Sequence, residues 1–143
     1  MNIFQEIKWK NVTPPGAIVD NAAFTTASMD IKDTVSWAFL VCLGGLDIAV
    51  AVMKLQESDN DSSYSDVSGA DFSVSPLTLP SATDDNKLYL ITGSSNGRKR
   101  YLDLSLTGGD GSSGSYISVL AGTLPKIKPD TAAERGVAQQ AIV

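Results

Sequence analysis

Short runs in which apolar and polar residues alternate fill the middle of the chain, and clusters of Gly, Asn, Asp and Ser separate them. Alternation with a period of two is typical of β-strands, and such clusters are typical of the turns that join them. The pattern predicts about seven strands, within the ranges 24–32, 36–45, 46–58, 69–80, 86–93, 98–109 and 114–124. Pro76 interrupts the range 69–80, so we expect an edge strand there.

Three of these runs indicate which faces are buried. Between Trp37 and Leu43 both the odd and the even positions are apolar, which predicts a central strand covered on both faces. The range 46–58 is apolar on both faces at first and becomes one-sided from Met53. In the range 98–109, leucines alternate with polar residues, which indicates one buried face and one solvated face.

The spacing of the turns predicts an all-β fold, an antiparallel β-sandwich or jelly roll with extended terminal arms. A parallel α/β fold is disfavoured because no segment has the pattern of a crossover helix. Only residues 129–140 have helical potential, and Gly136 interrupts them. We expect an N-terminal arm at 1–20, a sandwich domain at 21–125 and a C-terminal tail at 126–143.

The composition excludes several classes of protein. The 143 residues include no histidine and a single cysteine, Cys42, which excludes Ser-His-Asp catalysis and metal sites built from histidine or several thiolates. A net charge of −5 disfavours nucleic acid as a partner, because phosphate binding needs a basic face. The longest apolar run, 37–43, is too short to span a bilayer, and the first residues lack the apolar segment of a signal peptide. We expect synthesis in a cytoplasm and no membrane contact.

The stretch most suggestive of chemistry is "KLQESDNDSSYSDVSG", residues 54–69, with four acidic side chains and five serines. A calcium-binding loop needs a glycine at its sixth position and a bidentate glutamate at its twelfth. Counting from Asp59, Tyr64 and Ala70 occupy these positions, so the match fails at both. A hairpin turn explains the same residues better, because Asn, Asp and Ser side chains bond neighbouring backbone groups in turns. We expect no metal site here, and we identify no carboxylate pair for hydrolysis.

The glycine-rich stretches "GSSNGRKR" and "TGGDGSSGS" lack the spacing or the lysine of a phosphate-binding loop and are interpreted as hairpin loops. The first ends in Arg98, Lys99 and Arg100, the one concentration of positive charge in the sequence. These residues have two interpretations: a solvated strand start, or a contact with an acidic protein partner.

The acidic hairpin and the strand after the basic cluster carry motifs that resemble a family of small tailed-bacteriophage head proteins, the capsid decoration or cement proteins. A hairpin of the form "KxQES.D...WxDV.GA.F" is matched by Lys54, Gln56, Glu57, Ser58, Asp59, Asp66, Val67, Gly69, Ala70 and Phe72. A strand of the form "R.RYLR" is matched by Arg98, Arg100, Tyr101 and Leu102. The chain departs from the family at Tyr64, where tryptophan is expected, and at Asp103, where a basic residue is usual. The resemblance covers residues 35–125 and neither terminal segment.

The resemblance implies a structural virion protein that binds the outer surface of an expanded capsid, with the major capsid protein as its partner and a homotrimer as its assembly. It implies neither an enzyme nor a cofactor. Phe4 and Trp9 can act as buried anchors, and Pro14 and Pro15 limit the entropy lost on binding, so these residues and the basic cluster 98–100 are the candidate capsid contacts. The alternative is a carbohydrate-binding sandwich on a virion, which would need exposed aromatic residues such as Trp9, Tyr64 and Tyr116 on one flat surface.

Overall fold

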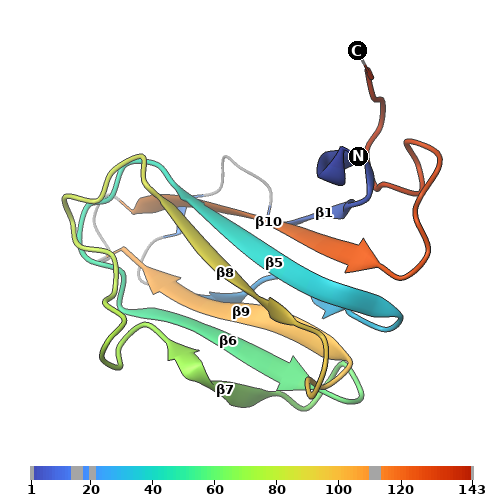
Figure 1. Ribbon diagram of the computed structural model, residues 1–143. Coiled ribbons are helices and arrows are strands. Elements are labelled where there is room, and N and C mark those ends of the chain that lie inside the picture. The colour runs from blue at the N-terminus through green and yellow to red at the C-terminus, as the bar shows by residue number, and fades with distance from the viewer. Residues whose placement is uncertain (1, 14–17, 20–21, 110–113, 143) are drawn as a thin grey trace.

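The computed structural model describes residues 2–13, 18–19, 22–109 and 114–142. It confirms the all-β fold: two antiparallel sheets pack face to face as a β-sandwich (Figure 1). The strands of the described residues are β1 (Lys8–Thr13), β2 (Ile18–Val19), β3 (Ala22–Thr25), β4 (Met29–Asp30), β5 (Thr34–Leu43), β6 (Val52–Ser58), β7 (Ser65–Asp71), β8 (Leu88–Ser94), β9 (Tyr101–Gly108) and β10 (Ser115–Pro125). In this part of the chain there is no helix long and apolar enough to cross a membrane.

One sheet has the strand order β1-β10-β5-β8 and the other has the order β3-β9-β6-β7; we name them sheet I and sheet II. Short strands extend both, since β2 pairs with β10 and β4 pairs with β9. Four of the pairs are nested: β6 with β7, β5 with β8, β3 with β9, and β1 with β10. The first half of the chain therefore pairs with the second half in reverse order. The β10–β5 and β9–β6 pairs then join this double ribbon into two sheets.

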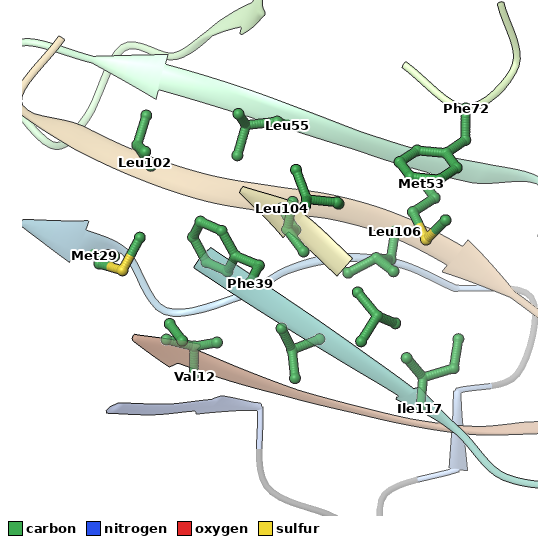
Figure 2. Close-up of a cluster of buried hydrophobic side chains, with 14 of the residues drawn as sticks. Val12, Met29, Phe39, Met53, Leu55, Phe72, Leu102, Leu104, Leu106 and Ile117 are labelled. Atoms are coloured by element: carbon green, nitrogen blue, oxygen red, sulfur yellow. The ribbon is translucent and has the colours of Figure 1, made fainter. Parts of the chain in front are cut away.

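The core lies between the sheets, where side chains of β5 and β10 face those of β6 and β9 (Figure 2). Phe39, Met53, Leu102, Leu104 and Leu106 are all fully buried. The apolar odd positions of β5 and the leucines of β9 thus point inward as their alternation predicts.

The second apolar face of β5 is not covered as expected. Ala38, Leu40 and Cys42 are half-buried on the outside of sheet I, and the neighbouring strand β8 exposes Leu88 and Leu90 there. The two apolar faces therefore serve different purposes, one in the core and one at the surface. The strand expected over residues 46–58 begins only at Val52, because the chain crosses from sheet I to sheet II over residues 44–51.

The terminal segments pack together at one end of the sandwich, where Figure 1 shows both chain ends. The N-terminal segment contains a short 3₁₀ helix, η1 (Ile3–Gln5), and β1, which is a full member of sheet I. The tail forms one helical turn that is closed at both ends. At its start, the Thr131 backbone N–H donates to Glu134 Oε2, and the Glu134 backbone N–H donates to Thr131 Oγ1. At its end, the Val137 N–H donates to the Ala132 carbonyl. This turn ends at Gly136, which has a φ of +74°.

Candidate functional site

The turn between β6 and β7 is closed by its own side chains. Asn60 Oδ1 accepts hydrogen bonds from the backbone N–H groups of Ser62 and Ser63 at 3.1 and 2.9 Å, and from Ser58 Oγ at 2.9 Å. The Tyr64 hydroxyl donates a hydrogen bond to Asp61 Oδ1, and this bond lowers the pKa of the Asp61 carboxyl. This arrangement confirms the predicted hairpin, because its polar side chains bond the turn itself.

Further along this hairpin, Asp66 accepts hydrogen bonds from Lys54 Nζ and Gln56 Nε2, each at 2.7 Å. The bond from Lys54 holds the pKa of the Asp66 carboxyl below its usual value. Across the described residues, no group of three or more His, Cys, Asp or Glu side chains converges where it can hold a metal ion.

Glu57 connects the acidic hairpin to the basic cluster 98–100. Its Oε2 atom lies 3.5 Å from Arg98 Nη1 and accepts the Lys99 backbone N–H at 3.2 Å. The Lys99 ammonium donates to Ser65 Oγ at 3.2 Å. The structure thus brings together two charged segments that are distant in sequence, since Lys99 follows Glu57 by 42 residues.

Arg100 is paired as well. Its Nε and Nη2 atoms donate to the two carboxylate oxygens of Asp30 at 3.1 and 2.7 Å, and its guanidinium stacks 4.9 Å from the Tyr101 ring centroid. The hydrogen bond from Arg100 lowers the pKa of Asp30. The basic cluster is therefore not a free positive patch, because each of its three side chains already has a partner within the molecule.

Asp103 is a buried carboxyl on the outward side of β9. It is only 5% exposed, and its Oδ1 atom has no hydrogen-bond partner among the described residues. Burial raises the pKa of Asp103 to about 6, and the neighbouring Asp61 carboxylate contributes to the rise. The expectation of a solvated face is wrong at this residue, since Asp103 is buried. Asp61 and Tyr64 of the β6–β7 turn lie close enough to interact with it electrostatically.

Trp9 and Arg135 join the two termini. The Trp9 backbone N–H donates to the Arg135 carbonyl at 2.7 Å. The Arg135 side chain is 6% exposed, and its guanidinium donates to four neutral oxygen atoms. These are the carbonyls of Gln5, Pro129 and Asp130, at 2.6, 2.6 and 2.9 Å, and Gln140 Oε1 at 2.8 Å. Because one buried cation bonds backbone from both ends of the chain, the tail and the N-terminal segment form a single unit.

This unit presents apolar side chains to solvent, and we name Ile3, Phe4, Trp9, Val137 and Ile142 the terminal surface. Phe4 is 68% exposed, and Ile3 and Ile142 are also exposed. Phe4, Trp9, Val137 and Ile142 line a hollow of about 320 Å³. Large apolar side chains held at the rim of a hollow are typical of protein contact surfaces.

The candidate capsid contacts fall into two neighbouring groups. Phe4 and Trp9 lie together in the terminal surface. A second hollow, of about 280 Å³, is lined by Trp9 and by Asp30, the partner of Arg100, so that surface continues towards Arg100. Arg98 and Lys99 lie at the β6–β7 hairpin. Pro14 and Pro15 lie outside the described residues.

The three aromatic residues of the alternative carbohydrate site do not all lie on one surface. Tyr64 belongs to the β6–β7 turn over sheet II, whereas Trp9 and Tyr116 belong to sheet I. Trp9 pairs with Gly122, six residues along β10 from Tyr116, so these two rings start about 20 Å apart. Trp9 and Tyr116 at this separation do not belong to one flat platform for a sugar.

Sequence reasoning missed Arg135 and the burial of Asp103. Arg135 lies in a polar, alanine-rich tail with no periodicity that would indicate a buried residue. Asp103 occupies an outward position in a clear alternation, so its burial depends on a turn that is distant in sequence. No protein-family model matches the chain, and no curated protein matches it.

Proposed function

We propose that the protein is a capsid decoration protein: a structural virion protein that binds the outer surface of an expanded tailed-phage shell and stabilises it. The observation that carries the proposal is the terminal surface. There the buried Arg135 bonds the carbonyl of Gln5, and the adjacent Phe4 is 68% exposed beside a hollow. In a single copy of the chain, Phe4 stays 68% exposed and so buries little apolar area. A partner that buries it gains an aromatic anchor of the kind that dominates protein interfaces.

The order of the strands supports the same proposal. Counting β1, β3, β5, β6, β7, β8, β9 and β10 as one to eight, the sheets read 1-8-3-6 and 2-7-4-5. We infer that the sandwich is a jelly roll, since this order is a double ribbon wound into two sheets. Jelly rolls are common among viral capsid domains. The motifs that resemble decoration proteins lie on the β6–β7 hairpin and on the segment that leads into β9.

Stabilisation follows from selective binding. A protein that binds the expanded shell and not its precursor shifts the equilibrium towards the expanded state by its differential affinity. Such a protein needs no catalytic residue and no cofactor, and its partner is the major capsid protein on the outside of the virion. A homotrimer on the shell is part of the proposal. The family that the motifs resemble implies a location at the local threefold positions of an icosahedral shell, and such a position favours a threefold assembly.

Co-sedimentation with shells of the parent phage tests the proposal. The full-length protein is expected to sediment with expanded shells and to remain in solution with unexpanded ones. Phe4→Ser is expected to weaken binding about tenfold or more, because it removes an aromatic anchor. Val74→Ser is the matched control, since Val74 is 60% exposed and lies on the loop after β7, outside the terminal surface. If the wild-type protein does not sediment with expanded shells, the proposed function is contradicted. If Phe4→Ser binds them as well as wild type, only the assignment of the terminal surface as the contact is contradicted.

A further inference from the structure

The strands at the ends of the two strand orders are β1 and β8 in sheet I and β3 and β7 in sheet II. They differ in whether their free edges are protected against pairing with another chain. Natural β-proteins block such edges with charges, bulges, short strands or covering segments, because an open edge pairs with other chains. In sheet II, β7 carries Asp66 and a register irregularity opposite Lys54 and Gln56, and β3 has only four residues. In sheet I, β1 carries Lys8 and Lys10, has an irregular register, and bonds the tail through Trp9.

Strand β8 has none of these protections. Its seven residues, "LYLITGS", include no charged side chain, and they pair with β5 in an unbroken register. Leu88 and Leu90 are 64% and 62% exposed on this edge. A long, regular, apolar edge of this kind pairs readily with another strand unless something covers it.

The free backbone groups of β8 can be assigned from the ladder. Leu43 N–H donates to the Lys87 carbonyl, and Ser95 N–H donates to the Val35 carbonyl, each at 3.0 Å. In an antiparallel ladder the bonding direction alternates, so the odd positions between them bond β5. The N–H and C=O groups of Leu88, Leu90 and Thr92 therefore point away from sheet I.

We propose that a second copy of this chain covers this edge, with the β8 strands of two copies pairing antiparallel across a twofold axis at Leu90. Leu90 then bonds Leu90 of the other copy, and Leu88 pairs with Thr92. Every outward backbone group of Leu88, Leu90 and Thr92 gains a partner, and the sheet I faces join into one sheet. This inference concerns the protein free of any shell and does not depend on the proposed function.

The absence of charge along this edge is compatible with a second copy as the occupant. The chain carries a net charge of −5, so two copies associate only through a surface that does not oppose like charges. The outward positions of β5 and β8 provide one, since Ser36, Ala38, Leu40 and Cys42 face outward beside Leu88, Leu90, Thr92 and Ser94.

The mass of the full-length protein in solution tests this pairing. Light scattering at micromolar concentration is expected to give twice the 15.0 kDa of a single chain. Leu90→Lys is expected to give the single-chain mass with an unchanged circular dichroism spectrum, because two lysines would meet at the axis. Ile127→Lys is the matched control: Ile127 is 86% exposed and lies beyond β10, so the doubled mass should remain. A single-chain or threefold mass for the wild type, or a doubled mass for Leu90→Lys, would overturn the proposal.

Disulfide trapping tests the register. In a Cys42→Ser background, Leu90→Cys is expected to form a covalent dimer on mild oxidation, because directly opposed residues have Cα atoms within disulfide range. Leu88→Cys in the same background is expected to form much less, since Thr92 lies opposite. Equal cross-linking of the two variants would overturn a twofold axis at Leu90.

Discussion

Gly136 packs against the backbone of Trp9 so closely that a Cβ atom at Gly136 would lie 2.0 Å from the Trp9 carbonyl oxygen. Gly136 also has a φ of +74°, a backbone region that residues with a Cβ atom rarely adopt. These two constraints and the buried Arg135 side chain seat the tail on β1. The terminal surface exists only while this contact is intact.

Gly136→Ala should therefore release the tail. We expect the free energy of unfolding to fall by roughly 2 kcal/mol or more, since the added methyl group meets backbone that cannot move aside. Hydrogen exchange at the Trp9 amide should become faster, because that N–H bonds the Arg135 carbonyl. Gly97→Ala is the control: Gly97 has a φ of +77° but open space around its Cβ position, so only backbone strain of about 1 kcal/mol applies. Equal losses in the two variants would mean that the tail contact contributes nothing.

Asp103 should make stability depend on pH in a defined window. Its pKa is raised from 3.8 to about 6 in the folded protein, so between these values the folded state holds a proton that the unfolded chain has lost. Stability from this group therefore rises as the pH falls from 7 to 4, and it is constant below that. Carboxyls with lowered pKa values, such as Asp30 and Asp66, act in the opposite direction and lose their contribution below about pH 4.

Asp103→Asn removes this charge. We expect the variant to be more stable than wild type by about 1–3 kcal/mol at pH 8, with a much smaller difference at pH 4. Urea unfolding of both proteins at the two pH values measures this. A difference that is the same at both values would show that the substitution acts through packing and not through the charge.

The acidic hairpin should respond to loss of its central acceptor and not to calcium. Asn60→Ala leaves the Ser62 and Ser63 N–H groups without their acceptor, so we expect a loss of about 1 kcal/mol. Asp59→Ala, at an exposed neighbouring position, should cost little. Millimolar calcium should leave the melting temperature of wild type unchanged, because a ligand stabilises only a state that it binds. A clear rise that disappears in Asp61→Ala would show a metal site.

Among these variants, a truncation in the core between the sheets should lower the free energy of unfolding most. Leu104 is completely buried at the centre of β9, and we expect Leu104→Ala to cost about 2–5 kcal/mol (Figure 2). Ile127→Ala, at a residue 86% exposed, should change stability by less than about 0.5 kcal/mol. Thermal unfolding of the two variants gives the comparison, and similar melting temperatures would contradict the assignment of the core.

The fold class could be predicted from sequence because period-two alternation reports directly on which side chains face a core. Leu102, Leu104 and Leu106 alternate with polar residues and are fully buried. Alternation does not report what covers the second face of a strand. Leu40 and Cys42 look like core residues in sequence, yet they lie at the surface beside β8.

The terminal surface could be predicted only in part. Phe4 and Trp9 are conspicuous as aromatic residues in a polar segment, and the structure places them together. Arg135 gives no such signal, because its role depends on carbonyl groups of Gln5, Pro129 and Asp130 that converge only in the folded chain. Positions that act through distant backbone groups carry no local pattern in sequence.

Because β6 and β7 are adjacent in the chain whereas β1 and β10 are the first and last long strands, each nested pair encloses the one before it. Closing a loop costs more entropy as the loop lengthens, so folding is expected to start at the β6–β7 hairpin and to add pairs outward. Substitutions in that hairpin, such as Asn60→Ala, should then slow refolding, while Gly136→Ala should mainly accelerate unfolding. The acidic stretch that looked most like a reactive site would thus affect the folding rate of the sandwich, and the contact between the termini would affect its unfolding rate.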